Sequence, residues 1–296
     1  MGKKLLVIIV TYNGMKWIDR CLSSLRASSL PADVLVIDNG SVDGGPEYIR
    51  EHYPEVIVHC AAQNLGFGRA NNVGLQKASA EGYDYVYLLN QDAWVYPETF
   101  ERLISAMQSH PEYGILSPMQ LTASGDKPDP RFARWCPERA EQEWRSSSEG
   151  QIHDVKFVMA AHWMVSRVCL NKVGGFSPAF AHYGEDDNYI HRARYHGFST
   201  GILSDALAVH DREMRPMSKQ ASMRLKCVAS VVKISNPLNC LPFRLLLQPV
   251  ELLAISVRYR SLSVFRYIFT LIGDYSRLKS IRSQSLQEGA FLESAE

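Results

Sequence analysis

Two segments of the sequence carry acidic side chains in positions suited to chemistry. Asn90-Gln91-Asp92 directly follows the apolar run 85–89, and Glu185-Asp186-Asp187 opens a predicted helix that is followed at a distance by His210. A Mg²⁺ or Mn²⁺ ion that bridges a diphosphate needs only one or two protein oxygens, a requirement that Asp92 meets. Each segment also has a simpler explanation, because Asp92 can cap the next helix and acids at a helix start interact favourably with the helix dipole.

Three further segments combine polar side chains with glycines at 10–13, 36–44 and 64–74. Asp38, at the end of an apolar run and before a glycine-rich turn, can accept hydrogen bonds from a nucleobase or ribose, although it can equally stabilise the turn itself. Arg69 and the glycines around it lie at a predicted helix N-terminus. Free backbone N–H groups and a guanidinium at that place suit a phosphate group.

Strands alternating with helices must position these segments. Apolar runs predict strands at 5–10, 34–37, 56–58 and 85–89, and helical spacing predicts helices at 17–25, 67–77, 100–107 and 185–196. This alternation indicates an α/β fold with a mixed, mostly parallel sheet flanked by helices, in which ligands bind beyond the carboxyl ends of the strands. We also expect a long irregular loop at 122–150, strands at 156–161, 201–203 and 207–209, and a short helix before Gly174.

Taken together and in this order, the segments resemble the GT-A fold glycosyltransferases of family 2, which include bacterial rhamnosyl- and galactosyltransferases of cell-surface polysaccharides. The resemblance covers residues 4–212 and rests on seven motifs: VTYN, VIDNGSVDG, NLGFGRANNVG, LLNQDA, VGGFSPAF, YGEDDNYIHRARYHGF and a strand ending in VH. It implies a Rossmann-like GT-A fold and an inverting transfer of a sugar from a nucleotide diphosphate sugar to an acceptor hydroxyl.

The resemblance also implies roles for individual residues. The first two motifs surround the base and ribose, and the third lies along the nucleotide and diphosphate. The residues implied in donor binding are Thr11, Tyr12, Asn13, Asp38, Ser41, Asp43, Asn64, Gly66, Arg69, Asn72, Asn90, Gln91 and Asp92.

The metal and the catalytic base follow from two family motifs. The DxD motif falls on Asn90-Gln91-Asp92, where an amide replaces the first acid, so that a divalent ion, Mn²⁺ or Mg²⁺, must depend on Asp92 and His210. Loss of one charge predicts weaker metal binding or a preference for Mn²⁺. The ED motif falls on Glu185-Asp186, which implies Asp186 as the general base, with Asp187 as the rival if the alignment is off by one.

Charge divides the chain into two parts. Residues 1–215 hold 21 Lys and Arg against 26 Asp and Glu, whereas 216–283 hold 11 against 2. We therefore expect a catalytic domain at 1–215 and a helical, basic extension at 216–296. Residues 241–257 are strongly apolar but are interrupted by Pro242, Arg244, Pro249 and Glu251, so they are poorly suited to span a membrane. A second segment has an apolar stripe at helical spacing, formed by Leu262, Phe265, Ile268, Phe269 and Ile272. With the basic residues Arg258, Arg260, Arg266, Arg277, Lys279 and Arg282, these segments predict a tail that rests on an anionic membrane surface. Packing on the catalytic domain or a homodimer interface is the alternative.

Six scattered cysteines and an N-terminal apolar run of only six residues favour a cytoplasmic protein, peripheral on the inner face of the cell membrane. The expected partners are a nucleotide diphosphate sugar and a saccharide or lipid-linked saccharide acceptor, without nucleic acid. Two alternatives remain open at this point. A pseudoenzyme that only binds nucleotide sugars is prompted by Asn90, and a sugar nucleotidyltransferase is disfavoured because its N-terminal phosphate loop is absent.

Overall fold

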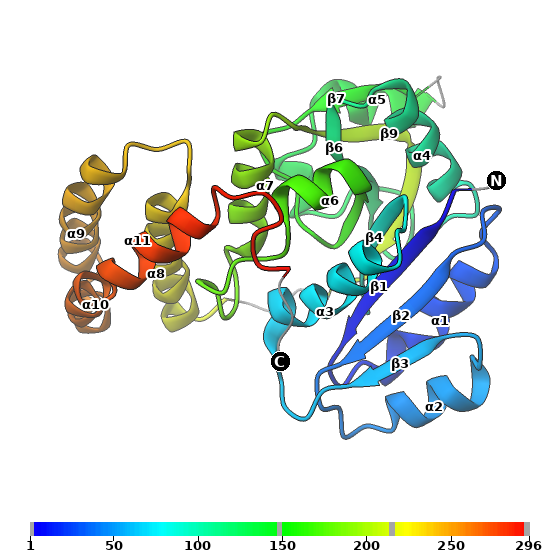
Figure 1. Ribbon diagram of the computed structural model, residues 1–296, viewed down its shortest axis with the longest axis horizontal. Helices are drawn as coiled ribbons and strands as arrows, with labels where there is room; N and C mark the ends of the chain where they lie inside the picture. The colour runs from blue at the N-terminus through cyan, green and yellow to red at the C-terminus, as the bar shows by residue number, and fades with distance from the viewer. Residues whose placement is uncertain (1–2, 147–149, 213–216, 293–296) are drawn as a thin grey trace.

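The computed structural model describes residues 3–146, 150–212 and 217–292 of the 296-residue chain. Its centre is a nine-stranded sheet (Figure 1). Eight strands follow the order β3-β2-β1-β4-β8-β6-β9-β5, and the ninth, β7, pairs with β9. Six strands run in one direction, and β5, β7 and β8 run against them. The strands are β1 (Leu5–Thr11), β2 (Asp33–Asp38), β3 (Ile57–Cys60), β4 (Tyr85–Asn90), β5 (Ala93–Val95), β6 (Tyr113–Leu121), β7 (Ile152–Asp154), β8 (His162–Ser166) and β9 (Ser199–His210).

Helices cover both faces of this sheet, as the sequence predicts. One hydrophobic core joins the sheet to α3 (Gly66–Ala80), α6 (Arg167–Val173) and α7 (Glu185–Tyr195). The other joins it to α1 (Met15–Arg26), α2 (Gly45–His52) and α4 (Thr99–Ser109). Strand β1 contributes Leu6 and Ile8 to the first core and Val7 and Ile9 to the second, which explains why its sequence is apolar without alternation.

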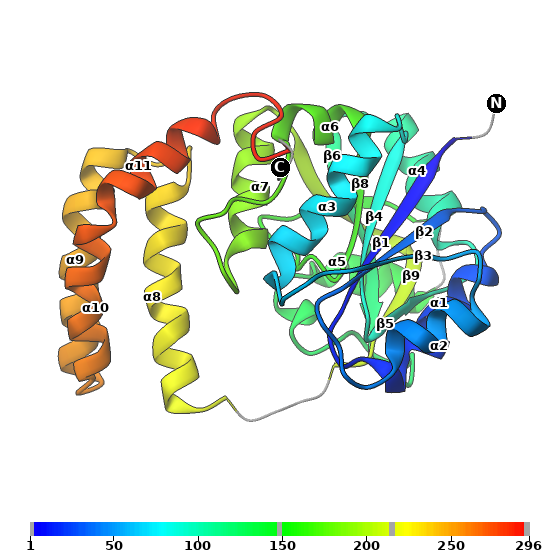
Figure 2. The same ribbon diagram turned by 60° about the horizontal axis from the view of Figure 1, so that its bottom comes forward.

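The predicted helical tail is present as α8 (Lys219–Ser235), α9 (Leu241–Arg258), α10 (Leu262–Gly273) and α11 (Tyr275–Gln284). These helices project from one side of the sheet, with α9 and α10 farthest from it (Figures 1 and 2). They enclose a core of their own, which includes Cys227, Ile234, Leu252 and Ile268. None of the helices in the described residues combines the length and hydrophobicity needed to cross a bilayer.

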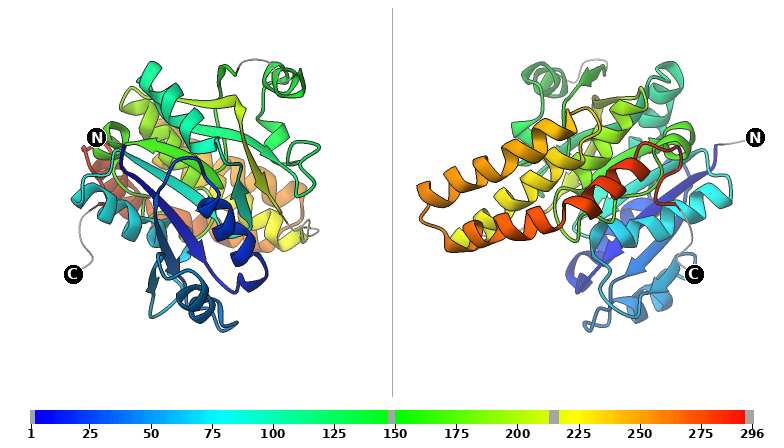
Figure 3. Two further views of the ribbon diagram at one scale, coloured as in Figure 1. Left: turned by 90° about the vertical axis from the view of Figure 1, so that its right-hand side faces the viewer. Right: turned by 60° about the vertical axis from the view of Figure 1, so that its left-hand side comes forward.

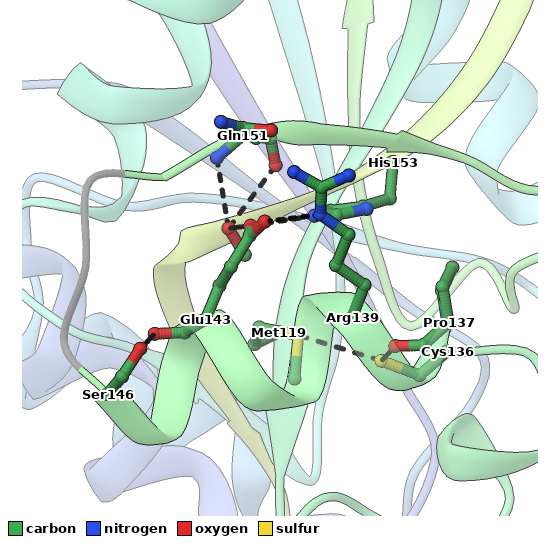
Figure 4. Close-up of polar contacts among 9 residues, drawn as sticks. Met119, Cys136, Pro137, Arg139, Glu143, Ser146, Gln151 and His153 are labelled. Carbon is green, nitrogen blue, oxygen red and sulfur yellow. Dashed lines mark hydrogen bonds and ion pairs between the residues drawn. The ribbon is translucent and has the colours of Figure 1, made fainter.

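The prediction of an irregular loop at 122–150 is wrong for its second half. Residues Phe132–Arg134 form a 3₁₀ turn and Glu138–Ser146 form α5. The pairs Arg139–Glu143 and Arg145–Glu141 are spaced i, i+4, so ion pairing supports a helix in a segment with little hydrophobicity. Figure 4 shows how Glu143 fixes α5 to the sheet through His153 of β7, at 2.7 Å.

Two strand predictions also need correction. Residues 156–161 are not a strand. The Ala161 carbonyl still bonds β4, accepting from Asn90 N at 3.1 Å, but the Val158 carbonyl accepts from a side chain, Trp163 Nε1, at 3.1 Å. Strand β8 begins only at His162. The two short strands predicted at 201–203 and 207–209 are one strand, β9, whose pairing with β6 shifts register beside Pro118.

Candidate active site

Strand ends bring most of the predicted site residues to one edge of the sheet. Thr11 pairs with Asp38 across β1 and β2, and Val10 pairs with Asn90 across β1 and β4. Strand β9 ends at this edge with His210. Parallel strands place their carboxyl ends together, so the clustering follows directly from the order of the strands.

Asp38 organises the first two loops of the site. Its Oδ1 accepts hydrogen bonds from the hydroxyls of Thr11, at 2.8 Å, and Ser41, at 2.5 Å. Its Oδ2 accepts from the backbone N–H of Gly40, at 3.1 Å, and of Ser41, at 2.9 Å. With only 2% of its surface exposed, this carboxylate shapes the turn that any nucleoside would meet.

Reciprocal hydrogen bonds join that turn to the loop after β1. Asn13 N donates to Ser41 Oγ at 2.9 Å, and Val42 N donates to Asn13 Oδ1 at 2.9 Å. Asp43 Oδ2 accepts from Met15 N at 2.9 Å. The two loops therefore form one rigid rim at the sheet edge.

A third loop contributes Asn64, Gly66 and Arg69. Asn64 Oδ1 accepts from Gly66 N at 2.8 Å, and Arg69 is exposed on the first turn of α3. Asn72, which belongs to the same motif, instead bonds the backbone of another segment. Its amide bonds the backbone of Phe176 in both directions, at 2.9 and 2.6 Å, and so holds the segment after α6.

The segment after β4 faces His210. His210 Nε2 lies 3.4 Å from Asp92 Oδ1 and 3.5 Å from Asn90 Nδ2. Burial tends to raise the pKa of Asp92, but the hydrogen bond and the charge of His210 outweigh it and lower that pKa below its usual value. Gln91 faces the other way, where its amide bonds the backbone N–H of Tyr12 at 2.8 Å and the Tyr12 carbonyl at 3.3 Å.

Asp92 and His210 fit the donor set of a divalent ion held jointly by a protein and a diphosphate. A carboxylate oxygen and an imidazole nitrogen suit Mn²⁺, and phosphate oxygens and water commonly complete such a shell. Within the described residues, no group of three or more His, Cys, Asp or Glu is arranged to hold a metal ion.

Buried groups hold His210 in place. His162 is fully buried, and burial, reinforced by His210, lowers its pKa to about 3. The ring is therefore neutral, donating from Nε2 to the Val209 carbonyl at 3.0 Å and accepting at Nδ1 from the Tyr87 hydroxyl at 2.9 Å. His162 and Trp163 are thus packed core residues, because Trp163 is also fully buried.

The three acids at the start of α7 share a poorly hydrated environment. Burial, with repulsion from Asp186, raises the pKa of Glu185 to about 7 and that of Asp187 to about 7. Burial also raises the pKa of Asp186, although Asp187 N donates to its Oδ1 at 2.9 Å. Because all three pKa values are raised, the charged forms of these carboxyl groups are disfavoured, and a carboxylate of this cluster accepts a proton more readily than an ordinary one.

Asp186 and Asp187 line a cleft of about 400 Å³. One wall is the apolar side of α8, with Leu225, Val228 and Val232. The opposite side carries aromatic and cationic residues that sequence analysis did not identify, namely Arg131, Arg134, Trp135, Phe157 and Arg212. A larger cavity of about 770 Å³ beside α4 and β7 contains none of the predicted site residues.

No sequence signal places Arg131 and Arg134 near acids more than 50 positions away. Arg212 offers a weak signal, since it lies two residues after His210. In the structure its guanidinium lies 3.2 Å from His210 Nδ1 and 3.6 Å from Asp129 Oδ2, which links the cleft to the Asp92–His210 pair.

The architecture is shared by solved sugar transferases and defines the GT-A fold. A crystal structure of S. aureus TarS residues 1–349 with UDP-GlcNAc matches with a TM-score of 0.56 at 18% identity, covering 82% of this chain and 69% of that one. Mannosyltransferase PcManGT from Pyrobaculum calidifontis, in complex with GDP-Man and Mn²⁺, matches with a TM-score of 0.53 at 16% identity, covering 97% and 88%.

Sequence similarity identifies the family. The family model described as "Glycosyl transferase family 2" matches residues 6–173, and the chain belongs to this family. An N-acetylglucosaminyl-diphospho-decaprenol L-rhamnosyltransferase of Mycobacterium tuberculosis is 27% identical over 231 residues, which is 70% of this chain and 75% of that protein. The family assignment confirms a glycosyltransferase and favours it over a nucleotidyltransferase.

Proposed function

We propose that this chain is an inverting glycosyltransferase in which Asp186 is the general base. The observation that supports this most directly is the placement of Asp186 in the cleft between α7 and α8, beside the edge where the nucleotide-side loops and Asp92 lie. Inversion requires the acceptor hydroxyl to lose its proton as its oxygen attacks the anomeric carbon from the side opposite the leaving diphosphate. Burial raises the pKa of Asp186, and a carboxylate with a raised pKa is a better proton acceptor.

On the donor side, we propose that the rim formed by Thr11, Asn13, Asp38, Ser41 and Asp43 receives the base and ribose. The diphosphate then lies between the start of α3, with Arg69, and Asp92, where N–H groups and a guanidinium favour negative charge. Asp92 and His210 would hold a divalent ion, Mn²⁺ or Mg²⁺, and such an ion stabilises the charge on a departing diphosphate.

For the acceptor, we propose a lipid-linked saccharide, by analogy with the diphospho-decaprenol-linked compound in the name of the mycobacterial relative. The cleft supports this choice because it combines three arginines, which suit a diphosphate, with the apolar wall of α8. The chain then acts in polysaccharide or glycolipid synthesis in the cytoplasm, on the inner face of the cell membrane.

A pair of isosteric variants tests the base. Asp186→Asn should reduce transfer, or donor hydrolysis in the absence of acceptor, by roughly a hundredfold to ten-thousandfold. Binding of the best donor from a panel of UDP, GDP and dTDP sugars should remain within a few-fold, because the base acts on the acceptor. Asp187→Asn is the matched control, since it removes a neighbouring acid of the same cleft.

The same calorimetric titrations, with and without Mn²⁺, test the donor side. Asp92→Ala should remove the Mn²⁺-dependent part of donor binding, whereas Asp186→Asn should keep it. Activity of Asp186→Asn near that of wild type, together with an inactive Asp187→Asn, would transfer the base to Asp187. Donor binding without turnover by the wild type across the panel would favour the pseudoenzyme.

A further inference from the structure

Helices α9 and α10 each carry a second apolar stripe that the fold leaves uncovered. The stripe residues repeat every three or four positions and are 40–76% exposed. They are Phe243, Leu246, Val250, Leu253 and Val257 on α9, and Leu262, Phe265, Phe269 and Ile272 on α10. We name these nine residues the α9–α10 apolar face.

Packing within the chain does not explain this face, because the tail's core uses other positions. On α9 the buried residues include Leu252, and on α10 they are Val264, Ile268 and Leu271. At 100° per residue these lie on a different side of each helix from the exposed stripes. Helix α10 is therefore apolar on two sides, of which the bundle covers one, whereas α9 buries Leu252 between Gln248 and Ser256 and leaves its apolar stripe exposed.

The position of the face keeps it away from the sheet. Helix α8 packs against α7 on one side and against α9 on the other, so α9 and α10 form the outermost layer of the molecule (Figures 1 and 3). Helices α9 and α10 pack against each other, and exposed apolar residues concentrated on two neighbouring helices are characteristic of surfaces that contact a membrane or another protein.

Charge distinguishes between those two partners. The two acids of 216–283 are already paired, Glu251 with Lys233 at 2.5 Å and Asp274 with Arg277 at 3.0 Å. Arg258 and Arg266 are exposed next to the stripes and have no carboxylate within 4.0 Å in the described part of the chain. A second copy would bring two strongly basic tails together, whereas an anionic membrane surface attracts each of them.

We propose that the α9–α10 apolar face is a membrane-docking surface, whose side chains enter the headgroup region of an anionic bilayer while the flanking arginines contact lipid phosphates. This inference deepens the proposed function, which places the acceptor at the membrane. It also gives α8 two roles, because one side of α8 lines the acceptor cleft and the other side supports the docking layer.

Vesicle co-sedimentation of the full chain tests the proposal. The wild type should bind vesicles of equal parts phosphatidylglycerol and phosphatidylcholine at low salt, and pure phosphatidylcholine much more weakly. Binding should fall at least about tenfold when four stripe residues become polar, because their burial in the interface is lost. The stripe variant carries Leu246→Gln, Val250→Gln, Phe265→Gln and Phe269→Gln.

The matched control changes four exposed apolar residues of the body, and it should bind like the wild type. It carries Ile57→Gln, Tyr96→Gln, Val168→Gln and Tyr195→Gln, at positions 39–63% exposed. Arg258→Gln with Arg266→Gln should weaken binding roughly fivefold for each arginine, and only at low salt.

Equal binding of the wild type and the stripe variant would overturn the proposal. So would a wild-type dimer in sedimentation velocity that the stripe variant abolishes while neither form binds vesicles, a result that assigns the face to a second copy. These measurements contain no sugar donor or acceptor. Their failure therefore leaves the proposed transfer reaction standing, and a failed transfer assay leaves the docking surface standing.

Discussion

At the residue scale, Glu185 differs from its two acidic neighbours by its isolation. It is 7% exposed, and its Oε2 has no hydrogen-bond partner among the described residues. Gly68 of α3 packs close to Glu185, since a Cβ added at Gly68 would lie 3.7 Å from the Glu185 Cβ, so water has little access. A buried carboxyl group without a partner is costly when charged, which explains the direction of its pKa shift.

This shift predicts how stability depends on pH. Because the folded pKa is about 7 and the ordinary value is 4.5, the native state holds a proton that the unfolded state has lost between these two pH values. The contribution of Glu185 to the free energy of unfolding therefore falls as pH rises through this window, by on the order of 1–3 kcal/mol. Glu185→Gln should lose less stability than the wild type between pH 5 and pH 8 in urea titrations.

Glu138→Gln, exposed at the start of α5, is the control and should keep the wild-type dependence. Parallel pH dependences for Glu185→Gln and the wild type would show that Glu185 is charged in the folded protein at neutral pH. The unpartnered Oε2 would then need another explanation.

At the scale of elements, the sequence predicts those strands in which nearly every residue is apolar and buried. Strands β1 and β4 are buried on both faces, so their apolar runs identify them. Strand β6 was not predicted, because Ser117, Pro118 and Gln120 interrupt its pattern. Ser117 and Gln120 are fully buried and bond each other at 3.0 Å, and Pro118 lies at the shift of register with β9, where no regular ladder exists.

The candidate site likewise contains residues that the local sequence pattern predicts and residues that only the tertiary fold brings there. Thr11, Asp38 and Asn90 were predictable together because each ends a parallel strand. Arg131 and Arg134 were not, since the turn that carries them, before α5, reaches the cleft of Asp186 only through the tertiary fold. Helix α2 and the three-residue strand β5 were missed because neither is long enough for a hydrophobic period to be visible.

A glycine at the start of α3 provides a prediction at this scale. Gly66 has φ +76°, and a Cβ there would lie 2.6 Å from the Ala181 carbonyl oxygen, in the segment before α7. Gly66→Ala should lower the free energy of unfolding by about 2–4 kcal/mol, from backbone strain and the clash together. Gly44→Ala shares the backbone strain, at φ +80°, but its Cβ meets nothing within 4 Å.

The difference between these two variants isolates the contact between α3 and the segment before α7. Chemical denaturation of both should give a larger loss for Gly66→Ala, by more than about 1 kcal/mol. Equal losses would mean that the two segments separate easily, and that the donor loop and the acids of α7 are not held in fixed relation.

At the scale of the whole molecule, the tail is fixed to the body at both of its ends. Helix α8 packs on Gly184, where an added Cβ would lie 2.8 Å from Val232. After α11 the chain returns to the body, where Gly175 N donates to the Ala290 carbonyl at 2.8 Å. The core of the tail is nevertheless separate from the two cores of the sheet, which supports the proposed division into 1–215 and 216–296.

Arg282 is the residue through which that division can be tested. Its buried guanidinium donates to four backbone carbonyls at the end of α8 and in the turn that follows it, including those of Ile234, at 2.8 Å, and Asn239, at 2.7 Å. Arg282→Met removes the guanidinium donors from these carbonyls and should destabilise the tail by about 2–4 kcal/mol. Hydrogen exchange should then accelerate in peptides of α8 to α11 and stay unchanged in β1 and β4, if the tail unfolds as its own unit.

Arg266→Met makes the same substitution at an exposed position of α10 and should leave exchange unchanged throughout. Acceleration of equal size in the tail and the sheet would show a single cooperative unit and refute a boundary near residue 215.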